Sequence, residues 1–273
     1  LARMANQGVP QLHTHGPRGE RLDQVEFHPA WHALMRRSMS SGLHSSVWEN
    51  SPDTRGNEHK ARATKFYLTS QLEAGHLCPL TMTSASVAAI MASPRVQKEW
   101  APKILSRKYD SAQKPALQKT AVTIGMGMTE KQGGTDVRAN RTTAERVGEG
   151  IYRLSGHKWF LSAPMSDGFV MLAQMGDGMC CFLVPRYLED GSKNGLHFQR
   201  LKDKLGNRSN ASAEVEFTDA FGYLLGDPGS GIRTILDMVT LTRLDCALAS
   251  AGMMRASLAE AVHYARGRSV FGK

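Results

Sequence analysis

The stretch that decides the fold reads Gly125-Met126-Gly127-Met128-Thr129-Glu130-Lys131-Gln132-Gly133-Gly134-Thr135-Asp136, and His157-Lys158-Trp159-Phe160-Leu161-Ser162 follows it. The four glycines let the backbone approach a flat ligand closely, and we expect them to take positive φ, which a side chain would resist. Thr129 and Thr135 add short hydroxyl groups. A flavin needs hydrogen-bond donors at its pyrimidine edge, at N5 and at its pyrophosphate. The two stretches together therefore predict a pair of flavin-binding loops.

A turn between buried strands is the simpler interpretation of each stretch taken alone. Glycine-rich segments between apolar runs are more often hairpin turns than cofactor loops, and Trp159-Phe160-Leu161 is typical of a core strand. The run is not a phosphate-binding P-loop, because no Gly-Lys-Ser/Thr closes it. It is not a dinucleotide-binding G-x-G-x-x-G either, because Glu130 occupies the third glycine position. Further motifs in a fixed order must decide between a turn and a cofactor site.

The residue pattern along the chain changes twice, from helical to β and back to helical. Pro29 opens a helical pattern with apolar residues at about 3.6-residue spacing. One long helical pattern runs from about Ile232 to Arg268, with a candidate interruption near Gly252. The other helical patterns cover about 58–74, 84–92 and 94–105. Short apolar or alternating runs separated by turn residues predict a mostly antiparallel β-domain, at 121–124, 151–154, 169–173, 180–184 and 213–217.

These patterns predict an α+β protein with four segments. Residues 1–26, rich in Gly, Pro, Arg and Gln, are expected to form an extended arm, and 27–119 part of an N-terminal helical domain. Residues 120–225 are expected to form the β-domain, and 226–273 the start of a C-terminal helical domain. The chain does not begin with Met, and its last amphipathic helix lacks partners for its apolar face, so we expect a fragment of a longer protein.

Several motifs in a fixed order resemble those of the acyl-CoA dehydrogenase superfamily. Met126–Glu130 with Gly133–Asp136 resembles its T-E-P-x-x-G-S-D signature, and Lys204–Ser209 resembles its K-x-G-x-R-x-S strand. Leu225–Gly231 resembles the L-G-x-x-x-x-G entry to its C-terminal helices, and Arg268–Gly272 its R-x-x-F-G motif. Their common order makes a chance resemblance improbable.

Three longer stretches are most similar to the AidB-like branch of that superfamily, flavoproteins of the adaptive response to DNA alkylation. They are Phe27–His32, Met128–Gly134 and Lys202–Asn210. Two departures from the general family pattern fit this placement. Lys131 stands where the signature has proline, and Phe160 stands where a tryptophan usually packs on the flavin.

The resemblance implies the acyl-CoA dehydrogenase-like fold, FAD as cofactor, an acyl-CoA-like substrate and a homotetramer when the protein is full length. It places the backbone of 126–129 and the Thr129 hydroxyl at the isoalloxazine edge, Thr135 by the pyrophosphate, and Ser162 at N5. Phe160 and Leu161 would cover one face of the ring. Arg268 would contact the dinucleotide of a neighbouring subunit. The cofactor-binding residues carried over from the family are Met126, Gly127, Met128, Thr129, Gly133, Gly134, Thr135, Phe160, Leu161, Ser162 and Arg268.

The catalytic base is not assigned to any residue of this chain. The family uses a glutamate that lies either in the C-terminal domain, beyond Lys273, or directly before the arginine that Arg243 resembles, where this chain has Thr242. Glu130 and Asp136 are expected to cap turns and loops. We therefore expect the 273 residues alone to be inactive as a dehydrogenase.

Three functions stay open. The first is a flavin oxidoreductase acting on CH–CH bonds of substrates such as isovaleryl-CoA. The second is a DNA-binding damage-response flavoprotein with little turnover, and the third is a flavin-binding protein without turnover.

Composition narrows the class of protein. The 41% apolar content is close to that of ordinary soluble proteins, and no apolar run approaches the roughly 18 residues of a membrane span, so we expect a cytoplasmic protein. The 34 basic and 25 acidic side chains give a net charge of +9, which favours anionic partners such as double-stranded DNA or the phosphates of a cofactor. The densest basic strip, 200–208, has no aromatic residues interleaved with it, which weakens the case for nucleic acid.

Neither the cysteines nor the histidines predict a metal site. Cys180 and Cys181 are adjacent, so a strand would send them to opposite faces, and we expect reduced, mostly buried thiols. His28 and His32 have a spacing that could hold a metal on a helix, but no third ligand is arranged beside them.

Overall fold

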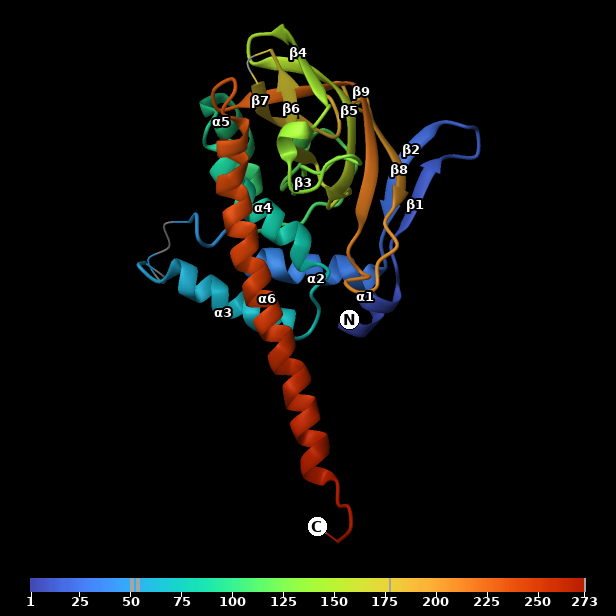
Figure 1. The fold of residues 1–273 in the computed structure, drawn as a ribbon, viewed down its shortest axis with the longest axis vertical. Helices are drawn as coiled ribbons and strands as arrows, with labels where there is room; N and C mark the ends of the chain where they lie inside the picture. The colour runs from blue at the N-terminus through green and yellow to red at the C-terminus, as the bar shows by residue number, and fades with distance from the viewer. Residues whose placement is uncertain (50–51, 53–54, 177, 273) are drawn as a thin grey trace.

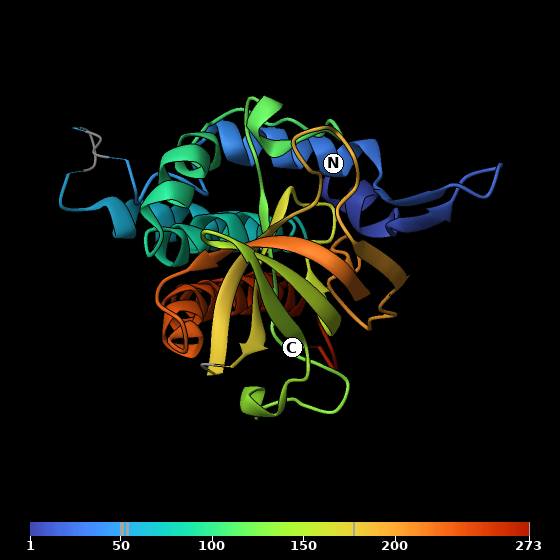
Figure 2. The same ribbon diagram turned by 90° about the horizontal axis from the view of Figure 1, so that it is seen from above.

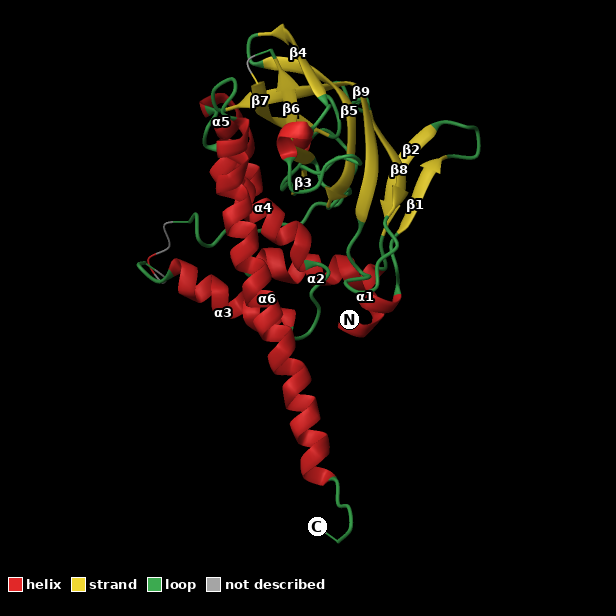
Figure 3. Ribbon diagram, viewed as in Figure 1, coloured by secondary structure: helices red, strands yellow, loops and turns green. Residues whose placement is uncertain are grey.

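The computed structural model describes residues 1–49, 52, 55–176 and 178–272 of the chain. Helices gather on one side of a strongly curved sheet, and the last helix extends far beyond the rest of the molecule (Figures 1 and 3). The α+β order expected from the sequence is confirmed. The α-helices are α1 Ala2–Gln7, α2 Pro29–Ser40, α3 Glu58–Ser70, α4 Leu77–Ile90, α5 Pro94–Ile104 and α6 Gly231–Gly267. The strands are β1 Gln11–His15, β2 Arg21–Glu26, β3 Ile124–Gly127, β4 Thr143–Gly148, β5 Ile151–Ser162, β6 Gly168–Met175, β7 Gly178–Pro185, β8 Leu196–Leu201 and β9 Ser212–Leu225.

Strands β3 to β9 form one sheet that closes on itself. Going round the ring, β5 pairs with β4, β4 with β6, β6 with β7, β7 with β9, and β9 again with β5. Most of these pairings are antiparallel, as expected, and the parallel ones join β6 to β3 and β4. Strand β3 fits between β5 and β6, and β8 extends the sheet beyond β9. Figure 2 shows this curved sheet from above, with the N-terminal helices covering one side.

Strands β6 and β7 are buried on both faces. Cys180 belongs to the hydrophobic core that includes α2 and the strand interior, and Cys181 belongs to a second core that includes α4, α5 and α6. Met171 likewise belongs to the first core and Leu172 to the second. The alternation of a strand explains this division, and the expectation that the two cysteines point to opposite faces is confirmed. Double-sided burial makes these strands the common wall between the sheet and the helices.

Residues 1–26 differ from the extended arm expected from composition. They form α1 and the hairpin β1–β2, whose register runs from Gln11 opposite Glu26 to His15 opposite Arg21. The hairpin is attached to β8, because Arg21 Nη2 donates to the Phe198 carbonyl at 2.8 Å and the Phe198 N–H donates to Asp23 Oδ1 at 3.0 Å. These contacts lie far apart in the sequence, so composition alone could not reveal them.

Helix α4 begins earlier than the pattern at 84–92 predicted, at Leu77. Twelve of its fourteen residues are buried, so it has no polar stripe from which periodicity could locate its start. Pro79 lies in its first turn, where a missing N–H costs no helical hydrogen bond. Among the described helices, none combines the length and hydrophobicity that crossing a membrane requires.

Helix α6 is one continuous helix of 37 residues, and the interruption considered at Gly252 is absent. Gly252 instead permits a close crossing with α3. A Cβ built on it would lie 2.1 Å from Ser70 Oγ and 2.6 Å from the Tyr67 carbonyl oxygen. Beyond this crossing, the helix stands clear of the other elements in Figure 1 and exposes large apolar side chains such as Met254 and Leu258.

Replacing Gly252 with alanine should therefore destabilise the protein, although alanine is the better helix former. The added methyl must displace the α3 backbone at Tyr67, and overpacking of this kind costs about 1–3 kcal/mol. Gly267→Ala in the same helix, where no atom lies within 4 Å of the added Cβ, is the matched control and should be neutral or slightly stabilising. Urea unfolding of both variants measures the difference, and equal midpoints would contradict the close crossing.

Candidate functional site

The two stretches singled out in the sequence lie side by side as neighbouring strands. Met126 pairs with Ser162 and Gly127 pairs with Leu161 in the antiparallel pairing of β3 with β5. Past the end of β3, the Trp159 N–H donates to the Thr129 carbonyl at 2.8 Å. The loop after it is attached to β5 as well, since the Lys131 N–H donates to His157 Nε2 at 2.9 Å. Segments about thirty residues apart in the chain thus form one surface.

A buried ion pair lies beneath this surface. Lys158 Nζ donates to Glu130 Oε1 at 2.7 Å, and both side chains are fully buried. The Thr142 hydroxyl also donates to Glu130 Oε1, at 2.6 Å, and the Arg141 N–H donates to Oε2 at 2.6 Å. Burial alone would raise the pKa of Glu130, but the Lys158 charge and these hydrogen bonds outweigh it and lower that pKa to about 2. Burial also lowers the pKa of Lys158, against the pull of Glu130.

The structural roles expected for the two carboxylates of the first stretch are confirmed. Glu130 accepts backbone N–H groups from Arg141 and Thr142 and so closes the loop between β3 and β4. Asp136 accepts the Arg138 N–H at 3.2 Å and caps the short 3₁₀ turn Val137–Ala139. The Glu130 carboxylate is buried and occupied by these bonds, so it is not free to act as a base in this arrangement.

The expectation of positive φ is wrong for all four glycines of the first stretch, and two of the four serve close packing. A Cβ on Gly125 would lie 2.3 Å from the Ser162 carbonyl oxygen, and one on Gly127 would lie 3.0 Å from Leu161 Cδ1. These two glycines therefore allow β3 to sit against β5. Gly134 has open space around its Cα, with no atom within 4 Å of an added Cβ. The loop at Gly133–Gly134 thus leaves room for a ligand.

The side chains of the second stretch differ sharply in exposure. Phe160 is 47% exposed, whereas Leu161 is fully buried in the core. Thr135 is exposed on the loop, and Ser162 is half-buried at the end of β5. Phe160 is therefore the ring that a ligand on this surface could meet, and Leu161 offers no exposed side chain to cover a ligand.

Two aromatic rings and two basic side chains meet beside this surface. The register of β5 against β9 slips between Lys158 and Leu161, which is the pattern of a β-bulge. Lys202 Nζ lies 3.5 Å from the Trp159 ring centroid and 4.4 Å from that of Phe160. Arg200 lies 5.8 Å from the Trp159 centroid. No aromatic residues interleave with the basic strip in the sequence, but sheet pairing brings two of them beside it from β5.

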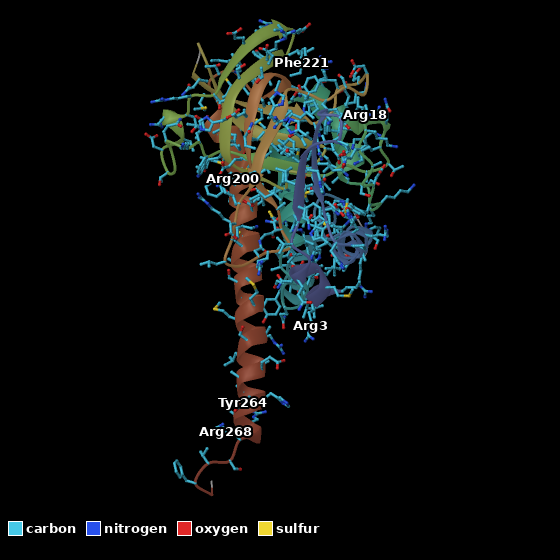
Figure 4. The ribbon with its side chains drawn as sticks, turned by 90° about the vertical axis from the view of Figure 1, so that its right-hand side faces the viewer. Arg3, Arg18, Arg200, Phe221, Tyr264 and Arg268 are labelled. Atoms are coloured by element: carbon cyan, nitrogen blue, oxygen red, sulfur yellow. The ribbon has the colours of Figure 1, made fainter. Side chains whose placement is uncertain are left out.

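Arg268 lies apart from the other ten residues carried over from the family. It follows the C-terminal end of α6, where its Nη1 donates to the Tyr264 hydroxyl at 3.1 Å. Figure 4 shows Arg268 and Tyr264 at the far end of α6 from Arg200. Within one chain, the structure does not bring Arg268 to the loops.

A groove of about 970 Å³ lies between α1, α3, α4, α6 and the turn at Gly206–Asn207. At one side of it, Arg62 Nη1 and Nη2 donate to the two Asp245 oxygens at 2.6 Å each, and the Thr81 hydroxyl also donates to Asp245. This buried pair joins α3 to α6, and no local pattern in the sequence signals it. Thr242 is buried one turn away, and its hydroxyl donates to the Val239 carbonyl at 2.8 Å.

Another buried network borders the same groove. Glu73 Oε2 lies 2.7 Å from His76 Nδ1, and His76 Nε2 lies 2.9 Å from Ser38 Oγ, while the Ser209 hydroxyl donates to Glu73 Oε1 at 2.5 Å. Burial would raise the pKa of Glu73, but the hydrogen bonds from His76 and Ser209 outweigh it and lower that pKa to about 2. The connectivity is that of a nucleophilic triad. His76 is nevertheless fully buried and Ser38 nearly so, which leaves no room for a substrate, and the network ties the turn after β8 to the helices.

The histidines and cysteines take structural positions. His28 Nδ1 accepts the Ala30 N–H at 3.1 Å and caps α2, and His32 Nδ1 lies 2.7 Å from the Tyr109 hydroxyl. Cys180 and Cys181 are buried, Cys78 is half-buried and Cys246 is exposed. In the part of the chain that the structure describes, no three His, Cys, Asp or Glu side chains are grouped as metal ligands.

Comparison with protein families accounts for almost the whole chain. The adaptive response protein AidB N-terminal domain matches residues 1–111, the acyl-CoA dehydrogenase middle domain matches 125–220, and the acyl-CoA dehydrogenase C-terminal domain matches 229–273. The chain belongs to the AidB-like branch of the acyl-CoA dehydrogenase superfamily.

Individual relatives agree with this assignment. The chain is 51% identical to the protein named AidB of Escherichia coli (strain K12) over all 273 residues, and 32% identical to acyl-CoA dehydrogenase family member 11 of Caenorhabditis elegans. It covers 50% and 45% of these two proteins, so it spans about half the length of the curated relatives that it matches.

Solved structures show the same fold. The whole chain superposes on 47% of Caenorhabditis elegans ACDH-11, solved in complex with C11-CoA, with a TM-score of 0.89 and 30% identity. Butyryl-CoA dehydrogenase from Megasphaera elsdenii matches 88% of this chain, and the chain covers 62% of it, with a TM-score of 0.74 at 22% identity. The acyl-CoA dehydrogenase-like fold expected from the motifs is confirmed.

Breaking the buried ion pair beneath the loops should destabilise the protein strongly. Lys158→Met leaves the Glu130 carboxylate buried without its countercharge, a change that costs about 3–5 kcal/mol of unfolding free energy. The double variant Lys158→Met/Glu130→Gln should recover part of that loss. Arg95→Met, which breaks a 3.8 Å pair with Glu99 that is mostly exposed, is the control and should cost at most about 1 kcal/mol. Equal losses in the two single variants, measured by urea unfolding, would show that the pair carries no special weight.

Proposed function

We propose that the protein is an FAD-binding flavoprotein of the acyl-CoA dehydrogenase type that acts on acyl-CoA-like molecules. One observation carries the proposal: the pairing of β3 with β5 joins 126–129 to 160–162 in a single surface. These are the two segments that the family motifs assign to the flavin. The family membership of the chain supports the cofactor, and one of its structural neighbours is PigA, solved with FAD and proline.

The residues present fit a flavin in several respects. The backbone of Met126–Thr129 and the Thr129 hydroxyl would meet the isoalloxazine edge, and Ser162 would reach N5 from the facing strand. Phe160 presents an exposed ring, which suits packing against the isoalloxazine. Thr135 is exposed on a loop with open space beside Gly134, as a pyrophosphate would require. Because Leu161 is buried, Phe160 is the side chain that would cover the ring.

Two parts of the proposal concern the full-length protein. Arg268 lies too far along α6 to serve the flavin of its own chain, and we propose that it meets the dinucleotide of a neighbouring subunit in a homotetramer. Figure 4 shows Arg268 at the end of α6, far from Arg200 and the β-domain. The subunit arrangement itself comes from the family resemblance.

The groove beside Thr81 and Asp245 is our proposed acyl-CoA site. Its lining is mostly apolar, and ACDH-11 was solved with C11-CoA. When bound, FAD would accept hydride from the β-carbon of the thioester. Thr242 cannot remove the α-proton, because its buried hydroxyl already donates to the Val239 carbonyl. Asp245 is held by Arg62 and Thr81, and Glu73 by His76 and Ser209, so we propose that the base lies outside these 273 residues. The chain alone would then be inactive.

The cofactor can be tested without measuring turnover. Purified full-length protein should bind FAD, and Thr135→Val should weaken binding by roughly 10- to 100-fold, because a hydrogen bond to a charged phosphate is worth about 1.5–3 kcal/mol. Thr218→Val, at an exposed position of β9, is the matched control and should leave the affinity unchanged. Flavin fluorescence titration gives both dissociation constants. No binding by the wild type at saturating FAD would refute the proposed function, and an unchanged Thr135→Val would remove only that residue from the site.

A DNA-binding role is the second candidate, and the cluster of Trp159 with Lys202, Arg200 and Lys131 favours it. Cations at 3.5, 5.8 and 5.6 Å from one ring centroid gather positive charge at one place, where it could contact the phosphates of a duplex. The net charge of +9 has the right sign for a polyanion.

If the full-length protein binds duplex DNA here, the logarithm of its binding constant should fall linearly with the logarithm of the salt concentration. Arg200→Glu/Lys202→Glu should weaken binding and reduce the salt slope. Arg95→Glu/Lys98→Glu, an equal charge reversal on exposed residues of α5, should do neither. Fluorescence anisotropy with a labelled duplex makes the measurement, and absence of binding at low salt would exclude this function.

A further inference from the structure

We propose that Lys202 is a positioning residue that fixes a positive charge behind Phe160 and thereby raises the reduction potential of the bound flavin. The inference rests on the proposed function, since it takes Phe160 as the ring that covers FAD. Lys202 lies outside the flavin-binding residues that the family motifs assign. Four features of the structure support it: a bulge, a restrained ammonium group, a net positive charge and an exposed ring.

The bulge brings two consecutive aromatic rings to one cation. In a regular strand, neighbouring side chains point to opposite faces, so Trp159 and Phe160 could not share a partner. Here Lys158 is opposite Val215 and Leu161 is opposite Ala213. Two residues of β5 therefore face one residue of β9, and both rings come within 4.4 Å of Lys202 Nζ.

The ammonium group of Lys202 is held in place. Its Nζ donates to Glu214 Oε1 at 2.7 Å, and its backbone N–H donates to the Ser212 carbonyl at 2.8 Å. The side chain is only 11% exposed, although the neighbouring Phe160 is 47% exposed. A lysine on an open surface would move among rotamers in water. The Lys202 side chain is restrained by two rings and a carboxylate, and its backbone is held by the hydrogen bond to Ser212.

The charges around the two rings sum to a positive value. Glu214 accepts from Lys202 and, at 2.8 Å, from Arg200 Nε, so one carboxylate faces two cations. Lys131 adds a further cation 5.6 Å from the Trp159 centroid. The cluster therefore keeps a net charge of about +2 around the Trp159 ring, and Lys202 is the member of it that also lies beside Phe160.

A fixed positive charge near a flavin favours its reduced form, because reduction adds negative charge to the ring system. A unit charge several ångströms away in a partly solvated site still interacts with the charge that reduction adds to the ring system. That interaction corresponds to a change of roughly threefold to tenfold in the ratio of reduced to oxidised FAD at a given potential. Lys202 and Glu214 should act with opposite signs, because one supplies the charge and the other partly cancels it.

Redox titration of the FAD-loaded full-length protein, with a reference dye at fixed pH, tests the inference. Lys202→Met should lower the midpoint potential, so that the reduced-to-oxidised ratio at the wild-type midpoint falls roughly threefold to tenfold. Lys202→Arg keeps the charge and should keep the wild-type midpoint potential. The shift caused by Lys202→Met should shrink at high ionic strength. Lys98→Met, an exposed lysine on α5, is the control for the loss of one charge and should leave the potential unchanged.

Glu214→Gln is the second variant, and it should raise the potential. It keeps the inference testable if Lys202→Met fails to fold or to retain FAD. An unchanged potential in Lys202→Met, an equal fall in Lys98→Met, no rescue by Lys202→Arg, or a fall in Glu214→Gln would each overturn the inference. A wild-type protein that binds no FAD would instead refute the proposed function itself.

Discussion

The Glu130–Lys158 pair is the interaction on which the candidate site depends. It joins the segment after β3 to the middle of β5 at a point where neither side chain reaches water. Glu130 accepts hydrogen bonds from Lys158, Thr142 and Arg141, and Thr142 contacts both partners of the pair. A shift of either segment would expose an uncompensated charge to an apolar interior, which costs far more than a shifted apolar contact. The pair therefore fixes one relative position of the two segments, and Gly125 and Gly127 make that position sterically possible.

Helix α4 connects this surface to the groove. Thr81 and Met82 line the groove, and the next residue, Thr83, accepts the Ile124 N–H at the start of β3, at 3.0 Å. One helical turn thus carries both the wall of the proposed acyl site and an anchor of the proposed flavin site. Because α4 is buried on nearly all sides and packs on α6, the two sites share a rigid support. A substrate in the groove and a cofactor at β3 would be held in register by the same helix.

The sequence predicted what depends on local pattern. Ordered motifs located the two stretches that pair as β3 and β5, although the second is a strand and not the expected loop. The apolar runs located β6 and β7, because alternation and spacing are properties of short segments. Contacts between distant residues were out of reach. Arg62 and Asp245 are 183 positions apart, and the cation over Trp159 comes from a strand that reaches β5 only through β9. The positive φ expected of the four glycines was wrong, and the reason for glycine at Gly125 and Gly127 is instead a neighbouring strand that leaves no room for a side chain.

The location of the positive charge also shows why net charge is a poor guide to function in this chain. Lys119 and Lys158 are buried and paired with Asp167 and Glu130 at 2.6 and 2.7 Å, so they contribute nothing to an outer potential. Arg186 is buried as well, and its guanidinium donates to two backbone carbonyls. At the proposed site, an anionic partner or a flavin would meet the small cluster around Trp159, where two rings lie against Lys202 and one carboxylate pairs with Lys202 and Arg200. Geometry, more than the sum of +9, therefore gives that surface its chemistry.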